Sequence, residues 1–122
     1  MALRANPGRL LVQHVAQGLI PDVVHLARSF RGPGALSRGD QIVRAALSVT
    51  SNIAEACGRT TVQKFRQFIG YARGSAQEVR AQLRVARLID PVRAREVMAL
   101  EIRAAVIIKM LWRLQLHPPP QT

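Results

Sequence analysis

Acidic residues are scarce in this sequence. Its 122 residues include 7 aspartates and glutamates against 18 lysines and arginines, which gives a formal net charge of +11. This excess is far larger than solubility requires, and it favours a polyanionic partner, with nucleic acid first and an anionic membrane surface second. Most of the basic residues are arginine. A GC-rich genome would favour arginine over lysine in this way, but it would not explain the shortage of acids.

Cysteine and long apolar runs are also lacking. The single cysteine, Cys57, excludes an internal disulfide and fits a reducing cytoplasm. We interpret it as a small buried apolar residue near a helix end. No apolar stretch approaches the roughly 18 residues that a membrane span needs, and Gln13, His14 and Gln17 interrupt the region that a signal peptide would keep apolar. We expect a cytoplasmic protein that does not enter a membrane.

Patterns typical of catalysis or metal binding are missing as well. His14, His25 and His117 are scattered along the chain, and no Cys/His pair has the spacing of metal ligands. No Ser-His-Asp set can be argued, and the Walker lysine pattern of a phosphate-binding loop is absent. We therefore expect no enzymatic activity, no cofactor and no metal.

Apolar residues recur at three- and four-residue steps in four segments, which predicts helices over about 8–30, 37–57, 61–88 and 91–115. The connecting loops are short, so successive helices should be antiparallel neighbours. We expect one domain over 1–122, an all-α, up-down-up-down four-helix bundle, with 116–122 as a tail outside it. The predicted core stripes are Leu11, Val15, Leu19, Val23, Leu26 and Phe30; Ile42, Ala46, Val49, Ile53 and Ala56; Phe65, Ile69, Ala72, Ala76, Val79, Leu83 and Ala86; and Val97, Leu100, Ala104, Ile107, Leu111 and Leu114.

Several residues predict where these helices begin, bend or approach each other. Pro21 should kink or divide the first helix, and Gly58 should end the second. Gly70 and Gly74 cost about 1 kcal/mol each inside the third helix, so we expect a neighbouring helix to approach closely there. Capping is predicted from pairs of residues: Ser37 with Asp40, Thr60 with Gln63, and Asp90 followed by Pro91.

The last helix has more apolar residues than one core stripe needs. Met98, Ile102, Val106 and Trp112 lie beside the stripe. A second apolar surface favours burial against another subunit; the alternative is a wide core face in a small bundle. We expect a homo-oligomer with these four residues in its interface.

Two blocks of sequence resemble a known family. "SVTSNIAEA" (48–56), Gly58–Arg59, "ARGS" (72–75) and Glu78 match the pattern of the four-helix-bundle protein family over about 24–114. That family includes proteins encoded in intervening sequences of bacterial 23S ribosomal RNA genes. It also includes accessory variability determinants, which assist the reverse transcriptase of diversity-generating retroelements. Because family members are homopentameric barrels, the resemblance implies a ring of five subunits here.

The sequence departs from the family pattern at four positions. Thr50 stands where the family has proline, and Ala56 where it has glycine. Arg80 replaces a commonly acidic residue and Arg66 a commonly apolar one. The last two departures add positive charge to the third helix.

Polar residues in the first block have a structural interpretation. Asn52 and Glu55 share a helix face. We expect Glu55 to pair with Arg73 or Arg59, and Asn52 to bond a nearby backbone group. A lone carboxylate without a second acid or base makes a poor catalytic centre.

The third helix carries the functional prediction. Arg59, Arg66, Arg73, Arg80 and Arg87 recur every seventh residue and should form a column on one flank of the helix. We expect Arg84 and Lys64 on the opposite flank. Over 59–95 there are nine basic residues and two acids, and a polyanion would relieve their repulsion. Because Tyr71 is the one stacking candidate nearby, backbone-directed binding of RNA or DNA is favoured over base reading.

These observations predict a non-enzymatic, homo-oligomeric nucleic-acid-binding protein. The resemblance implies that it assists a reverse transcriptase by holding template RNA or nascent DNA. Two alternatives stay open: a protein of the 23S rRNA intervening-sequence type, and a scaffold whose basic surface meets an acidic protein.

Overall fold

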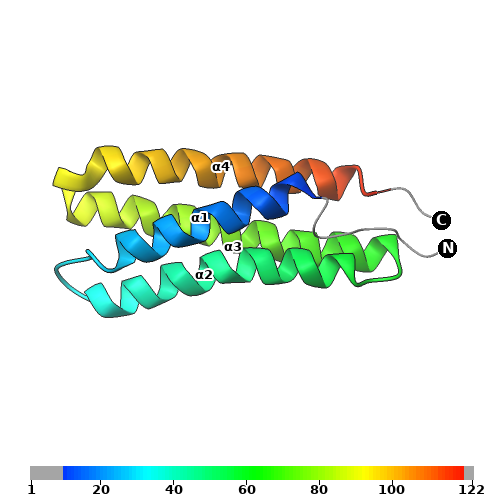
Figure 1. The fold of residues 1–122 in the computed structure, drawn as a ribbon, viewed down its shortest axis with the longest axis horizontal. Helices are drawn as coiled ribbons and strands as arrows, with labels where there is room; N and C mark the ends of the chain where they lie inside the picture. The colour runs from blue at the N-terminus through cyan, green and yellow to red at the C-terminus, as the bar shows by residue number, and fades with distance from the viewer. Residues whose placement is uncertain (1–9, 120–122) are drawn as a thin grey trace.

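The structure, a computed structural model, describes residues 10–119. Its helices are α1 (Leu11–Ala27), α2 (Ala35–Cys57), α3 (Val62–Ile89) and α4 (Ala94–Leu116), with one 3₁₀ turn, η2 (Pro91–Arg93), before α4. They form the predicted all-α four-helix bundle, whose successive helices run in opposite directions (Figure 1). The helix bounds lie within a few residues of the predicted ones. The predicted start of the first helix and the last tail residues fall outside the described range.

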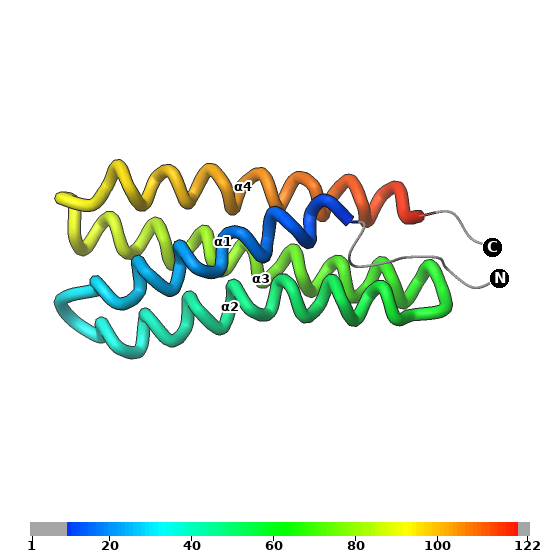
Figure 2. The backbone as a smooth tube through the Cα atoms, in the orientation of Figure 1, coloured from blue at the N-terminus to red at the C-terminus, as the bar shows by residue number. Residues whose placement is uncertain are grey.

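Each helix packs against the next along the chain, and α1 closes the bundle against α4. α1 crosses obliquely between α2 and α4 (Figure 1). The α1–α2 loop and the α3–α4 turn lie at one end of the bundle, and the α2–α3 turn lies at the other (Figure 2). α3, the longest helix, has α2 on one flank and α4 on the other. Its two flanks therefore border different surfaces.

The predicted stripes of α2 and α3 are buried in full, and the stripe of α4 is buried apart from Leu114, which is half-buried. In α1 the prediction is wrong in the first turns. Val12 and Ala16 are buried there, whereas Leu11 is 68% exposed and Val15 is half-buried. The predicted stripe took three four-residue steps in a row, and each such step turns the side chain about 40° further round the helix. The observed steps alternate four and three, which keeps the stripe facing the core.

Buried Gln13 fits this α1 register because its Nε2 donates to the carbonyl oxygen of Thr50 on α2 at 3.0 Å. A buried amide without such a partner would destabilise the fold. Pro21 lies inside α1 without dividing it. The bond from Gln13 thus joins α1 to α2 at Thr50.

Helix starts differ from the predicted caps. α2 begins at Ala35, after Gly34 with φ of 67°, so Ser37 already lies inside the helix and the Ser37–Asp40 capping box is wrong. A left-handed φ of this kind favours glycine. At α3 the cap is Thr61, whose Oγ1 accepts from the backbone N–H of Lys64 at 3.2 Å, one residue later than predicted. Gly58 follows the last residue of α2 as predicted.

The α3–α4 turn also departs from the prediction. Pro91 begins the 3₁₀ turn rather than α4 itself, and the side chain of Asp90 makes no capping hydrogen bond. The Asp90 carboxylate instead lies 3.9 Å from the guanidinium of Arg93. None of the helices in the described part of the chain is both long and apolar enough to cross a membrane.

Candidate nucleic-acid interface

The seven-residue arginine series of α3 runs along the seam between α3 and α4. Because the two helices are antiparallel, each arginine of the series lies beside a different residue of α4. From one end to the other, these α4 neighbours are Gln115 at Arg66, Trp112 at Arg73, Ile108 at Arg80 and Glu101 at Arg87. Two of the neighbours are polar, one is aromatic and one is aliphatic. The four arginines are therefore in four different environments.

Arg87 forms an ion pair with Glu101 of α4. Its Nε donates to Oε2 of Glu101 at 2.7 Å, and the side chains are only 27% and 11% exposed. A charge-assisted hydrogen bond between side chains that are this well buried contributes to stability. Removal of either residue would leave the charge of the other without a partner. Arg87 was predicted to bind nucleic acid, and the structure shows that its guanidinium is already engaged within the fold.

Arg73 stacks on an aromatic ring. Its guanidinium carbon lies 4.2 Å from the centroid of the Trp112 ring, a cation–π contact between α3 and α4. Trp112 is nevertheless 46% exposed. The contact places Trp112 against Arg73 of α3, and its predicted interface with Met98, Ile102 and Val106 stays a prediction.

Arg66, Arg80 and Arg84 keep their charged groups free. All three are exposed, and none has an ion pair or a side-chain hydrogen bond to another residue within 10–119. Arg80 and Arg84 line one open groove of about 480 Å³, together with Gln77, Ala81, Val85 and Ile108. The predicted placement of Arg84 on the opposite flank is therefore wrong. A four-residue step advances the side chain by only about 40°, which brings Arg84 beside Arg80.

Arg59 lies in the α2–α3 turn, before α3 begins, so its predicted place in the column on α3 is wrong. Arg59 forms an ion pair with Glu55, as one of the two predicted pairings had it, and its guanidinium carbon lies 4.5 Å from the centroid of Phe68. The Phe68 ring meets Tyr71 edge-on, with 5.4 Å between the centroids. Asn52 donates to the backbone oxygen of Ser48 at 2.9 Å, as predicted. Lys64 is exposed on the first turn of α3.

The predicted oligomer interface is exposed in the single chain. Met98, Ile102 and Val106 are 49%, 65% and 45% exposed on α4. Large apolar side chains at this spacing lie in a line along one face of a helix. We call Met98, Ile102 and Val106 the α4 stripe. It is a second apolar surface in addition to the core face of α4.

The predicted close approach of helices is found at one glycine of the pair. A Cβ at Gly70 would lie 2.9 Å from Nε2 of Gln115, whose amide donates to the carbonyl oxygen of Arg66 at 3.1 Å. A Cβ at Gly74 would meet nothing within 4 Å among the described residues. The Gly74 prediction is wrong for the single chain.

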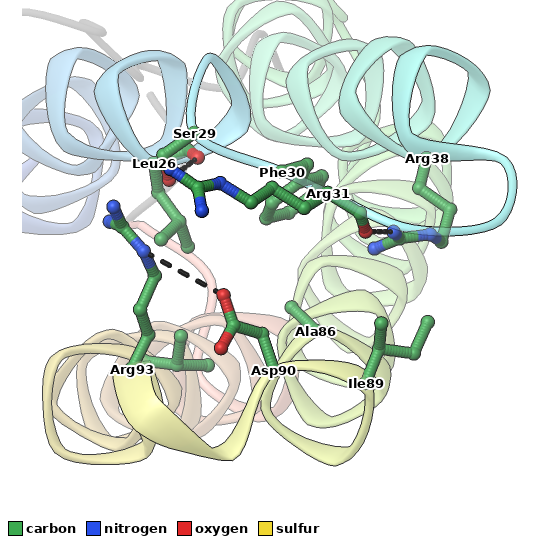
Figure 3. A pocket seen from close by; sticks show the side chains of 10 residues that line it. Leu26, Ser29, Phe30, Arg31, Arg38, Ala86, Ile89, Asp90 and Arg93 are labelled. Atoms are coloured by element: carbon green, nitrogen blue, oxygen red, sulfur yellow. Dashed lines mark hydrogen bonds and ion pairs between the residues drawn. The ribbon is translucent and has the colours of Figure 1, made fainter.

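A second group of basic residues surrounds a small pocket at the loop end of the bundle (Figure 3). Arg31 and Arg93 enter it from the α1–α2 loop and the α3–α4 turn (Figure 3). Arg38 donates to the backbone oxygens of Arg31 at 2.6 Å and of Pro33 at 3.1 Å. Arg93 pairs with Asp90 and Glu96. Arg38 thus holds the α1–α2 loop in place through backbone oxygens, which sequence reasoning missed, and Arg93 holds the α3–α4 turn through carboxylates.

Cys57 is buried at the end of α2, as interpreted from the sequence. Burial raises the pKa of its thiol above the usual value because the thiolate is poorly solvated there. In the described part of the chain, histidine, cysteine and carboxylate side chains form no group of three that could hold a metal ion.

The comparison with known families agrees with this arrangement. A model of the 23S rRNA-intervening sequence protein family matches residues 9–113. The chain belongs to this family. The match spans all four helices of the bundle and both sequence blocks that carried the resemblance. No curated protein matches the chain.

Proposed function

We propose that this protein is a non-enzymatic, cytoplasmic, homo-oligomeric nucleic-acid-binding protein whose α3 face contacts the phosphate backbone of RNA or DNA. The observation that supports it best is the set of free guanidinium groups on that face. Arg66, Arg80 and Arg84 are exposed and form no ion pair with the described residues. Glu101, an acid along the same seam, forms an ion pair with Arg87. Phosphates would relieve the repulsion between the free groups and release counterions.

The arginines also differ in whether their charged groups have partners within the fold. Six arginines of the described part of the chain have an ion pair or ring contact within the fold, namely Arg38, Arg59, Arg73, Arg87, Arg93 and Arg103. On α3, Arg66, Arg80 and Arg84 have no such contact, and the last two line an open groove. Backbone contacts of this kind position a protein on nucleic acid without reading its sequence.

Assembly would multiply the effect of the face. The α4 stripe offers an apolar surface for a second copy, and the family resemblance favours five subunits. In a ring, each free α3 face would be repeated around the axis, which strengthens both the electrostatic field and the avidity for a long polyanion.

For the biological context we propose the accessory role beside a reverse transcriptase, holding template RNA or nascent DNA. This proposal is supported by the resemblance to accessory variability determinants and by Arg80 in a commonly acidic position. The family description names 23S rRNA intervening sequences, which is the alternative context. The genes beside this one separate the two, since a reverse transcriptase gene next to it supports the retroelement and an interrupted 23S gene contradicts it.

The binding proposal is tested with a variant that changes Arg66, Arg80 and Arg84 to glutamine together. A fluorescently labelled RNA or DNA oligonucleotide is titrated at several salt concentrations. The parent protein should bind with a steep salt dependence, and the variant should bind more weakly. Its slope of log K against log salt should be shallower by about 2, because each lost phosphate contact to a single strand removes ~0.7 from the slope.

A matched control changes Arg28, Arg44 and Arg95, which are also exposed but lie just after α1, on α2 and on α4. This control loses the same net charge, so it reports the contribution of overall charge alone. Equal loss of affinity in the two variants would contradict a localised α3 site. Undiminished binding in the α3 variant would remove these arginines from the interface.

A further inference from the structure

Trp112 is the largest side chain of the protein, yet it is 46% exposed. One face of its ring is covered by the guanidinium of Arg73 at 4.2 Å. This contact holds the ring against α3 and gives it a fixed orientation. Such a pre-ordered aromatic surface loses little conformational freedom when a second flat group stacks beside it.

The surface next to this pair is low. Gly70 precedes Arg73 by three residues on α3, and Gly74 follows it directly. At Gly70 the amide of Gln115 fills the space that a side chain would take, whereas around Gly74 a Cβ would meet nothing within 4 Å among the described residues. A flat ligand can therefore approach the Arg73–Trp112 pair past Gly74, where no side chain of the described residues is in the way.

The groove with free arginines lies directly beyond this pair. Ile108, which lines the groove, precedes Trp112 by one turn of α4, and Arg80 follows Arg73 by two turns of α3, about 10 Å at ~1.5 Å per residue. Ala81, Val85 and Ile108 make part of the groove apolar, while Arg80 and Arg84 supply charge. Aromatic surface, apolar lining and free guanidinium groups thus follow one another along the α3–α4 seam.

We propose that Trp112 and Arg73 form a stacking site for an unpaired nucleobase, and that the same strand continues along the seam with its phosphates on Arg80 and Arg84. This inference rests on the proposed function and narrows its ligand to single-stranded nucleic acid. Bases within a duplex are stacked on each other and do not present a free face, whereas single strands stack on aromatic side chains and arginine planes.

The same geometry reassigns Trp112. It was grouped with the α4 stripe as an oligomer contact, but its ring stacks on Arg73 of α3, one helical turn from Ile108 in the arginine groove. Stacking on every base is similar, so the site would favour single strands without selecting a sequence.

The experiment uses the fact that Trp112 is the only tryptophan of the chain. Its fluorescence is followed in the full protein while three polyanions are added: oligouridylate or oligothymidylate, the matching RNA duplex, and inorganic polyphosphate. The single strands should quench the emission. Polyphosphate should bind through the arginines without quenching, because it has no bases. The RNA and DNA arms show whether the sugar matters.

Two variants complete the test. Trp112→Leu should weaken binding of labelled single strands by roughly 5- to 100-fold, with little change for polyphosphate, and Trp112→Phe should recover most of the affinity. Binding of all three polyanions without quenching, together with unchanged affinity in Trp112→Leu, would overturn the stacking site and leave the proposed function standing. Failure of every polyanion to bind would overturn both.

Discussion

The guanidinium of Arg73 on α3 lies 4.2 Å from the centroid of the Trp112 ring on α4. Two further contacts join the same two helices: Gln115 donates to the carbonyl oxygen of Arg66, and Arg87 forms an ion pair with Glu101. Together they set the register in which the arginine series meets α4. Arg80 lines a groove with an aliphatic residue of α4, Ile108, and forms no ion pair with the described residues.

The first prediction concerns the ion pair between Arg87 and Glu101. Glu101→Gln removes the charge that Arg87 faces in a half-buried seam, and we expect a loss of about 1–2 kcal/mol in the free energy of unfolding. Urea denaturation followed by circular dichroism measures it. Glu96→Gln is the matched control on the same helix, because Glu96 pairs with Arg93 near the surface. That change should cost less than about 1 kcal/mol. Equal losses in the two variants would contradict the structural role given to Glu101.

The second prediction separates the two glycines of α3. Gly74→Ala should stabilise the folded chain by about 0.5–1 kcal/mol, because alanine is the better helix former and the site is open in the single chain. Gly70→Ala should gain less or lose stability, since its Cβ would push Gln115 away from the Arg66 carbonyl. Thermal unfolding of the two variants side by side checks this order. A reversed order would show that the seam near Gln115 is packed differently.

The third prediction concerns the α4 stripe. Ile102→Glu places a charge in the centre of the apolar surface, and we expect it to dissociate the oligomer because a buried unpaired charge is costly. Light scattering should show a smaller particle, while the helical circular dichroism stays the same. Leu36→Glu serves as control, since Leu36 is also highly exposed but lies at the start of α2. A parent protein that is already monomeric would contradict the oligomer proposal itself.

The fourth prediction concerns Cys57. Burial raises the pKa of its thiol, so the thiol stays protonated at a pH where an exposed cysteine begins to ionise. The stability linked to this group is fully present below the pKa of the unfolded chain, and it is lost as the pH rises through the higher folded pKa. A thiol reagent should therefore react slowly with the folded protein up to mildly alkaline pH and rapidly in urea. Equal rates in the two states would show that Cys57 is accessible.

The helices and most of the core could be predicted from the sequence because their apolar residues follow an uninterrupted rhythm. α3 is the clearest case, since its seven seam residues from Phe65 to Ala86 are all buried. In α1, two overlapping apolar series were available, Leu11 with Val15 and Val12 with Ala16. Only packing against the other helices decides between them.

The candidate site was harder to predict, because its properties depend on contacts between helices. The spacing of the arginines placed them on one flank of α3, but it could not tell which of them would find a partner. Arg87 meets Glu101 and Arg73 meets Trp112 through the register of two antiparallel helices. Arg84 was placed on the wrong flank, although its four-residue separation from Arg80 was enough to predict the shared groove.

The central claim is that the arginine series divides into structural and binding members. The most direct test compares the affinities of the Arg80→Gln and Arg87→Gln variants for a single-stranded oligonucleotide. Both variants lose one charge from the same seam and are compared at equal salt in their folded state. We predict that Arg80→Gln binds several-fold more weakly than the parent, while Arg87→Gln keeps its affinity and loses thermal stability. Weaker binding by Arg87→Gln, with Arg80→Gln unchanged, would contradict the account.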